Sequence, residues 1–180
     1  MKSEKIIVLD GTPSGVDDLS RAREALMAEL RKSAREVSIV ELREEKFAHC
    51  TGCFQCWLKT PGMCRFADRG REIVAAMVQS DVVPLFTPVT FGGYSSTLKK
   101  LVDRWVQCAL PFFTKRQGET HHPKRYPRFP RLLALGVQRE PSAGEAAIFK
   151  TLVGRNALNF DPPSFASEVV AAGGSAAAMS

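Results

Sequence analysis

The chain has 180 residues and a net charge of +6; 44% of its residues are apolar and 24% are charged. This composition excludes a disordered or fibrous protein and predicts one globular domain over residues 1–180. No apolar run approaches the ~18 residues of a membrane span, and the first residues do not form a secretory leader. We therefore expect a cytoplasmic protein with reduced thiols and no membrane partner.

The first elements in chain order form a predicted strand–helix–strand unit. Lys5 to Leu9 is a short, β-branched apolar run, which is typical of a buried parallel strand. A glycine-rich turn then leads into an amphipathic helix from Asp17 to about Ser33, capped by Asp17 or Asp18. Glu36 to Leu42 alternates polar and apolar residues and predicts a second strand near a sheet edge.

A cluster of cysteines follows the second strand. Four of the five cysteines lie at positions 50, 53, 56 and 64. Thiols this close together, in a protein without an export signal, indicate a metal or cluster site, or a redox pair, rather than a disulfide framework. We expect the fifth, Cys108, to pack in the core, and we expect His49 to be a surface histidine.

The next two elements are a helix and a third strand. Asp68 is the expected cap of a helix that ends near Val78. Asp81 to Thr87 is a buried apolar run and predicts a strand, although Pro84 within it removes one ladder hydrogen bond.

A glycine-bearing loop from Pro88 to Tyr94 follows, and Ser95 or Ser96 caps a helix that continues to Leu110. Thr114 to Arg131 has no periodicity and is predicted to be a long loop. This segment holds six basic side chains and one acid, so it carries +5 of the net charge of +6. Because no helix presents these charges in a row, we expect no nucleic-acid partner.

The remaining elements are a fourth strand (Leu132 to Val137), a helix (Ala143 to Ala157), a weak fifth strand (Phe165 to Val170) and a frayed tail (Ala171 to Ser180). Strands that alternate with helices predict an α/β three-layer sandwich with a five-stranded parallel sheet, for which we take the order 2-1-3-4-5. Ligands of such sheets bind where the strand order reverses. Here this point lies between three loops, at residues 11–18, 88–94 and 136–144.

Three segments resemble the flavodoxin-like NAD(P)H-dependent FMN reductases, and within them the iron-sulfur flavoproteins. They are the first strand with Gly11-Thr12-Pro13-Ser14, the cysteine segment with Lys59-Thr60-Pro61-Gly62, and Thr87 to Ser96 followed by Asp103-Arg104. The resemblance spans about residues 5 to 140 and implies a flavodoxin-like fold. The C-terminal helix of that fold would be short or missing, reduced to Ala176-Ala177-Ala178, which leaves a sheet face for a second copy in a homo-oligomer.

The resemblance also implies an FMN at the strand ends, with its phosphate in the first loop and its ring against the loop after the third strand. The implied cofactor-binding residues are Thr12, Ser14, Ser20, Pro88, Val89, Thr90, Phe91, Gly92, Gly93 and Tyr94. Hydroxyl and amide groups near a helix N-terminus suit a phosphate dianion. The chain departs from the family at Asp17 and Asp18, whose charges oppose a phosphate. It also departs at Thr90, where Phe91 or Tyr94 would supply the aromatic contact with the flavin.

The implied function is an oxidoreductase that passes electrons from NAD(P)H through FMN to an unidentified acceptor. Because the flavin carries out the hydride chemistry, no side chain is predicted to be catalytic. An alternative is an iron-sulfur electron carrier that serves a protein such as ferredoxin, with a [4Fe-4S] cluster on Cys50, Cys53, Cys56 and Cys64. A metal-free thiol loop and a zinc site also remain open for these cysteines. A further alternative is a degenerate module without FMN.

Two segments are expected near the flavin. The cysteine segment follows an edge strand, so we expect it to lie beside the flavin edge. The basic segment is expected to attract the phosphates of NADPH or to pack over the flavin of a neighbouring subunit. His121 and His122 within it would either touch substrate or remain in a solvated loop.

Overall fold

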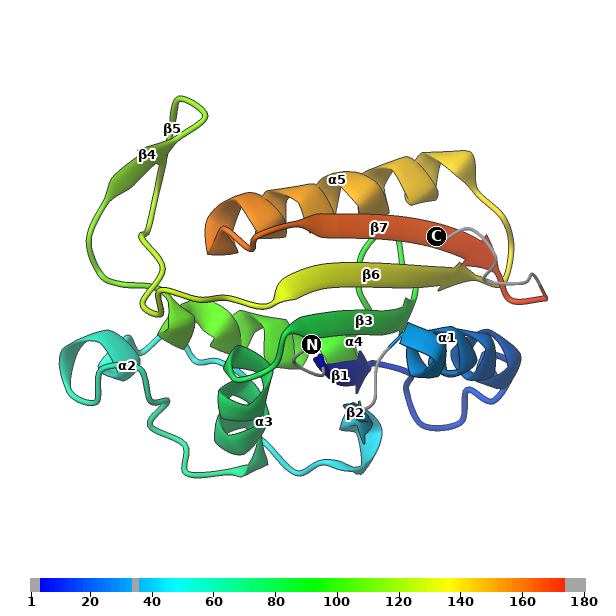
Figure 1. Cartoon of the computed structure of the whole chain (residues 1–180), viewed down its shortest axis with the longest axis horizontal. Helices are drawn as coiled ribbons and strands as arrows, with labels where there is room; N and C mark the ends of the chain where they lie inside the picture. The colour runs from blue at the N-terminus through cyan, green and yellow to red at the C-terminus, as the bar shows by residue number, and fades with distance from the viewer. Residues whose placement is uncertain (1–3, 34–35, 174–180) are drawn as a thin grey trace.

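Figure 1 shows the computed structural model of the chain, which describes residues 4–33 and 36–173. A five-stranded parallel sheet runs through it in the order β2-β1-β3-β6-β7. The strands are β1 (Lys5–Asp10), β2 (Glu36–Glu41), β3 (Val82–Pro88), β6 (Arg131–Gln138) and β7 (Phe165–Ala171). Counted in chain order within this sheet, the order is 2-1-3-4-5, which confirms the predicted fold class and places the reversal of strand order between β1 and β3.

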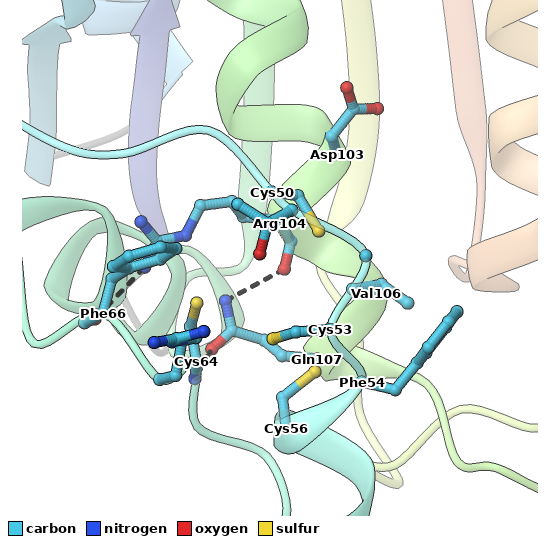
Figure 2. Close-up of a pocket in the computed structure, with 13 residues that line it drawn as sticks. Cys50, Cys53, Phe54, Cys56, Cys64, Phe66, Asp103, Arg104, Val106 and Gln107 are labelled. Atoms are coloured by element: carbon cyan, nitrogen blue, oxygen red, sulfur yellow. Dashed lines mark hydrogen bonds between the residues drawn. The ribbon is translucent and has the colours of Figure 1, made fainter.

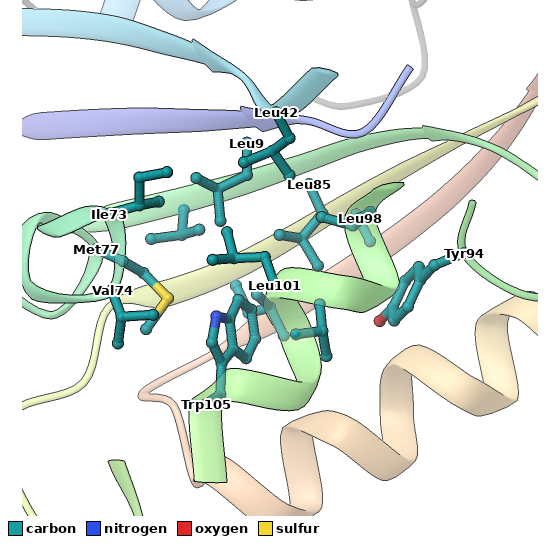
Figure 3. Packing of buried hydrophobic residues seen from close by; sticks show 14 of the residues in the cluster. Leu9, Leu42, Ile73, Val74, Met77, Leu85, Tyr94, Leu98, Leu101 and Trp105 are labelled. Carbon is teal, nitrogen blue, oxygen red and sulfur yellow. The ribbon is translucent and has the colours of Figure 1, made fainter. Parts of the chain in front are cut away.

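Helices cover the two faces of the sheet unequally. Successive side chains of a strand point to opposite faces, so Ile6 and Val8 of β1 pack with Leu26 of α1 (Ser20–Ser33). Ile7 and Leu9 face the other way, into a larger core built with α3 (Arg69–Val78), α4 (Ser96–Val102) and α5 (Ala143–Phe160). Figure 3 shows this second core, in which the indole of Trp105 and the side chain of Leu101 lie among residues of the strands. The predicted C-terminal helix at residues 176–178 lies outside the described residues.

The central strand β3 tolerates its proline because of where Pro84 falls in the ladder. The pairing with β6 runs from Val82 opposite Arg131 to Pro88 opposite Val137. The pairs with β1 are Ile6–Val82, Leu9–Leu85 and Asp10–Phe86, so Pro84 lies between them. The neighbouring pairs on either side hold the strand in register.

The helix predicted to run to Leu110 begins as expected and then tightens. Ser95 is its N-cap: the Ser95 hydroxyl accepts from the Leu98 N–H (3.1 Å) and donates to Gly11 O (2.5 Å), which fixes the start of α4 at the carboxyl end of β1. From Asp103 to Cys108 the chain forms the 3₁₀ helix η2, so the prediction of one continuous helix is wrong. The Gln107 side chain donates to Arg104 O (2.9 Å) and so competes for an acceptor that an α-helix would use.

Two other expectations are corrected at helix starts. The helix α1 begins at Ser20 instead of Asp17. Asp68 does stand at the N-cap position of α3, but its carboxylate makes no capping bond. It accepts instead from the Ala48 N–H and from Arg104, which draws it into the loop beneath the helix.

The basic segment contains a hairpin, so the prediction of a structureless loop is wrong. Strands β4 (Thr114–Arg116) and β5 (Glu119–His121) pair antiparallel, and the connecting Gln117 and Gly118 both have positive φ, 49° and 82°. Two such residues form the tight turn that matches strand twist. Figure 1 shows the hairpin projecting beyond the sheet. The chain also contains the short helices η1 (Leu42–Glu44) and α2 (Gln55–Leu58).

Ion pairs hold the hairpin against the C-terminal end of α5. Arg155 of the helix contacts the carboxylate of Glu119 with both terminal nitrogens (2.9 and 2.5 Å). Arg116 donates to the backbone oxygens of Leu158 and Asn159 (3.1 and 3.0 Å). Among the six basic residues of the segment, Arg116 docks the hairpin, and Lys124 pairs with Asp161 at the end of α5 (3.4 Å). Among the described residues, no helix is both long enough and apolar enough to cross a membrane.

Candidate functional site

The three loops predicted to meet at the strand ends do meet, around a cavity of about 620 Å³. We call it the strand-end cavity. The first loop contributes Pro13 and Val16, and the loop after β3 contributes residues 88–91. The loop after β6 supplies residues 137–142, and Glu145 of α5 completes the wall. The cavity therefore lies where the strand order reverses, which is the usual ligand position in a doubly wound sheet.

A smaller cavity of about 140 Å³ lies against the first turn of α1 and shares Val16 with the strand-end cavity. Its walls include the hydroxyl side chains of Thr12 and Ser20 and the guanidinium groups of Arg23 and Arg43. Asp10 lies beneath, buried, accepting from the Thr12 N–H (2.8 Å) and pairing with Arg23 (3.1 Å). Hydroxyls and guanidinium groups are donors that suit a phosphate, so the donor set fits the phosphate end of an FMN.

The two acids of the first loop have different surroundings. Asp17 lines the smaller cavity. Asp18 forms a bidentate pair with Arg139 of the loop after β6, at 2.7 and 2.9 Å, across 121 residues of sequence. Hydrogen bonds from this guanidinium lower the pKa of Asp18. The charge of Asp18 is therefore compensated, and Arg139 is a residue at the cavity that sequence reasoning missed, because nothing local marks its partner.

The loop after β3 ends in a tight turn from Thr90 to Gly93, which exchange two backbone hydrogen bonds of 3.0 and 2.8 Å. The central residues Phe91 and Gly92 both have positive φ, 50° and 75°. The turn presents the Phe91 ring, 90% exposed, at the mouth of the strand-end cavity. Gly92 packs so closely on α5 that a Cβ there would lie 2.7 Å from Ile148.

The predicted cofactor-binding residues separate into three groups. Pro88, Val89, Thr90 and Phe91 line the strand-end cavity. Thr12 and Ser20 line the smaller cavity. Neither wall includes the remaining predicted residues, which are Ser14, Gly92, Gly93 and Tyr94.

Tyr94 is a core residue in this structure. It is buried, its ring packs edge-on against Phe149 with ring centroids 5.7 Å apart, and its hydroxyl accepts from Asn156 (3.0 Å). Of the two aromatic residues that could stand in for a flavin contact, Phe91 is therefore the one that the fold leaves at the cavity.

The four clustered cysteines line a second site, a cavity of about 340 Å³ that we call the cysteine cavity. Figure 2 shows the side chains of Cys50, Cys53, Cys56 and Cys64 around it, with Arg104 and Gln107 of η2 on the opposite wall. All four thiols are unpaired. The spacing of the cysteines therefore does bring them together around one space.

The cysteine segment is fastened to η2 at several points. Arg104 donates to Ala48 O (3.0 Å), to Phe66 O (3.4 Å) and to the carboxylate of Asp68 (2.8 Å), so it holds both ends of the segment. Gln107 accepts from the Cys64 N–H at 3.0 Å. The Trp57 indole donates to Val106 O at 2.9 Å. No sequence pattern predicted these roles, apart from the presence of Arg104 in a segment that resembles the family.

The chemistry of the donor set suits a thiolate-ligated cluster, because four thiols face one space. Among the described residues, no three His, Cys, Asp or Glu side chains converge as a metal site. This holds for the cluster and for zinc alike, so the arrangement does not distinguish the two interpretations.

The thiols differ in accessibility and acidity. A backbone hydrogen bond from Gln55, together with contacts from Thr51 and Arg65, lowers the pKa of the exposed Cys53. Burial, and secondarily the other three thiols, raises the pKa of Cys56. Burial raises the pKa of Cys108 to about 12, and its position in the core confirms the prediction for this residue. His49 is exposed, also as predicted.

We expect iodoacetamide to alkylate Cys53 of the apo-protein first and Cys108 last. The thiolate is the reactive species, and the pKa of Cys53 is lowered whereas that of Cys108 is raised. Peptide mass spectrometry after short exposures gives the order. Since the pKa of Cys53 is lowered, its alkylation rate should reach a plateau at a lower pH than that of the denatured chain. Faster labelling of Cys108 than of Cys53 in the folded protein would contradict this arrangement.

The strand-end and cysteine cavities lie at opposite ends of α4 and η2 and share no lining residue. The N-cap of α4 contacts Gly11 at the carboxyl end of β1, whereas Val106 and Gln107 near the end of η2 contact the cysteine segment. The two helices together span roughly 20 Å by their rise per residue. The expectation that the cysteine segment lies beside the strand-end site is therefore wrong within a single chain.

Residues 4–126 match the family model described as flavodoxin-like fold. An iron-sulfur flavoprotein of Methanocaldococcus jannaschii is 35% identical over 101 residues, covering 56% of this chain and 51% of that protein. One from Archaeoglobus fulgidus is 31% identical over 100 residues, covering 56% of this chain and 44% of that protein. The chain thus spans about half the length of the curated relatives it matches.

Solved structures support the same fold. An NAD(P)H:quinone oxidoreductase from Methanothermobacter marburgensis superposes with a TM-score of 0.70 at 13% identity, over 97% of this chain and 88% of that chain. The apo form of an NADH:FMN oxidoreductase gives a TM-score of 0.61 at 16% identity, over 94% and 76% of the two chains. Together with the family match, the sheet order and the position of the strand-end cavity, these findings show that the chain belongs to the flavodoxin-like fold family.

Proposed function

We propose that the chain is an FMN-dependent oxidoreductase that uses NAD(P)H to reduce an acceptor. The observation that carries this proposal is the pair of adjoining cavities at the strand ends, one large enough for a ring system and one lined by phosphate-type donors. The names of the structural neighbours, an NADH:FMN oxidoreductase and an NAD(P)H:quinone oxidoreductase, agree with it.

Two groups of residues would hold different parts of the cofactor. Thr12, Ser20, Arg23 and Arg43 would bind the phosphate, and the apolar wall formed by residues 88–91 would hold the flavin ring. A bound FMN supplies the hydride and electron chemistry. The protein contributes position, exclusion of water and the electrostatic field.

Reconstitution tests the proposal. Apo-protein mixed with FMN and passed over a desalting column should keep a flavin absorption spectrum, and the loaded protein should oxidise NADH or NADPH with ferricyanide as acceptor. An Arg23→Ala, Arg43→Ala double variant should lose the retained flavin, because both guanidinium groups line the phosphate cavity. Protein that retains no flavin at any FMN concentration would overturn the proposal.

Removing the charge of Asp18, which pairs with Arg139, is expected to increase the affinity for FMN. In Asp18→Asn the carboxylate that opposes an anionic cofactor is removed and Arg139 is released, so we expect FMN to bind several-fold more tightly. Arg139→Ala leaves Asp18 uncompensated and should weaken binding by a similar factor. Fluorescence quenching of FMN on titration measures both changes. Equal affinities for the two variants would show that the pair has no influence on the cofactor.

A second candidate function is an iron-sulfur electron carrier, and the shared cavity of four thiols is the observation that favours it. The two curated relatives are named iron-sulfur flavoproteins. Cys50, Cys53, Cys56 and Cys64 would be the ligands of a [4Fe-4S] cluster. Iron and sulfide analysis of anaerobically purified protein discriminates the two candidates, with Cys108→Ser as the matched control that should keep both elements.

The carrier function would also require an assembly. The strand-end and cysteine cavities of one chain lie at opposite ends of α4 and η2, separated by roughly 20 Å of helix. We therefore propose that electrons would pass from one cavity to the other across two copies in a homo-oligomer. Sedimentation of the loaded protein tests this. A monomer that reduces its own cysteine centre through bound flavin would contradict it.

A further inference from the structure

A fourth cavity, of about 460 Å³, lies between the cysteine segment, η2, the hairpin and α5. We call it the aromatic cavity. It shares only Phe54, Asp103 and Val106 with the cysteine cavity and has no lining residue in common with the strand-end cavity. The proposed flavin site and cysteine centre do not use it.

A row of rings runs along the aromatic cavity, and Phe54, Trp57 and His122 of this row line its walls. The centroid distances are 5.0 Å from Phe54 to Trp57, 4.7 Å from Trp57 to His122, and 5.2 Å from His122 to Phe113. Phe160 supplies a further ring on the α5 side. Phe113 is 76% exposed and Phe54 is 47% exposed, so part of this aromatic surface faces solvent.

These rings are held in place by separate anchors. The Trp57 indole N–H is bound to Val106 O at 2.9 Å. His122 Nδ1 donates to Phe112 O at 2.8 Å. Phe160 stacks on Phe129, with centroids 5.7 Å apart and planes inclined by 9°. A ligand would therefore meet walls that are already oriented and would lose little affinity to reordering side chains.

Polar side chains make up half of the lining of the aromatic cavity. Asn159 Oδ1 lies 2.9 Å from His121 Nδ1, and no described residue accepts from the Asn159 NH₂ group. Asn156 is fixed by donating to the Tyr94 hydroxyl. Lys99 also lines the cavity and pairs with Asp103. A preformed cavity of this size, which combines ring surfaces with hydrogen-bonding groups that can orient a ligand, has the character of a small-molecule site.

We propose that the aromatic cavity binds a planar, multi-ring aromatic molecule that carries carbonyl oxygens. Its rings would stack with Trp57 and His122, since offset and tilted ring contacts are favourable. A carbonyl oxygen would accept from the Asn159 amide. The ligand would contact Phe54 and Val106, whose other sides line the cysteine cavity, so it would lie next to the four thiols.

The test uses apo-protein and the probe 9,10-anthraquinone-2-sulfonate, whose quinone ring has no position open to thiol addition. The chain has two tryptophans. Trp57 lines the cavity, whereas Trp105 is fully buried in the core. We expect saturable quenching of tryptophan fluorescence. In Trp57→Phe the remaining emission from Trp105, whose ring packs 5.3 Å from that of Phe160 in the cavity wall, should report weaker binding of the probe.

Two phenylalanines give a matched control. Phe54 in the aromatic cavity and Phe91 at the strand-end cavity are both exposed and both have positive φ, 52° and 50°. Phe54→Ala should weaken probe binding by about tenfold, equivalent to about 1.4 kcal/mol, and His122→Ala should do so as well. Phe91→Ala should leave it unchanged. Excess FMN should not displace the probe, so the result does not depend on the proposed flavin site.

If Phe91→Ala weakens probe binding and Phe54→Ala leaves it unchanged, the probe lies in the strand-end cavity and the inference is overturned. Quenching that fails to saturate, or that is equal in all variants, would overturn it as well. Circular dichroism of each variant verifies the fold. His122→Ala acts from a different segment than Phe54→Ala, so one misfolded variant does not remove the test.

Discussion

Replacing Arg104 by methionine is expected to lower the free energy of unfolding by about 3–5 kcal/mol, because it leaves a partly buried carboxylate without its partner. The Arg104 side chain has 0% exposure and pairs with Asp68 at 2.8 Å. It also holds the backbone oxygens of Ala48 and Phe66, so its loss releases both ends of the cysteine segment. Urea unfolding followed by circular dichroism gives the change.

The matched control is Arg69→Met. Arg69 also forms two carboxylate contacts, with Glu45 and Glu72, but its side chain is 47% exposed. Exposed pairs contribute little, so this variant should unfold close to the wild-type midpoint. Adding Asp68→Asn to Arg104→Met should recover part of the loss, because it removes the unpaired charge. Equal destabilisation by the two arginine variants would contradict this account.

The same pair predicts a pH dependence. Burial acts to raise the pKa of Asp68, but hydrogen bonds from Arg104 and from the Ala48 N–H outweigh it and lower the pKa below the usual 3.8. A carboxylate with a depressed pKa in the folded state contributes stability that is complete above its unfolded pKa and is lost as the pH falls through the folded value. Wild-type protein should therefore lose more stability below about pH 4 than Asp68→Asn loses.

Gly92→Ala is expected to weaken FMN binding by about tenfold or more, which is the largest effect we predict at the strand-end cavity. Gly92 has φ +75°, which opposes any side chain. An added Cβ would lie 2.7 Å from the Cβ and Cγ2 of Ile148, close to the backbone of α5. The turn must shift to relieve this contact, and Phe91 would shift with it. Overpacking of this kind also costs about 1–3 kcal/mol of stability.

Gly93→Ala is the control for this prediction, one residue along the same turn. Gly93 has no positive φ, and a Cβ there would meet only Thr90 O at the ordinary distance of 3.4 Å. Flavin titration and thermal unfolding should show small changes. The double variant Gly92→Ala, Ile148→Ala removes the contact with Cγ2 but keeps the contact with the Cβ of residue 148 and the backbone strain, so it should recover only a small part of both losses. Identical behaviour of the two glycine variants would show that the turn does not position the cofactor.

The comparison of sequence with structure is most instructive at the charged residues. The basic segment seemed to be an open surface for an anionic ligand, yet Arg116 of this segment binds backbone oxygens of α5, and Glu119 of the same segment pairs with Arg155 of that helix. Asp18 seemed to oppose a phosphate, yet Arg139 compensates it from 121 residues away. Charge type is visible in a sequence, but the effect of a charge depends on the partner that folding brings to it.

The sequence by itself determined the order and kind of most elements, because strand and helix periods are local properties of the chain. Lys5 to Leu9 predicted the buried β1, the pair Ser95-Ser96 predicted a cap for α4, and the cysteine spacing predicted a shared site. Only the tertiary structure decided where that site lies relative to the strand ends. That outcome rests on contacts between distant segments, such as Trp57 with Val106, which no local pattern encodes.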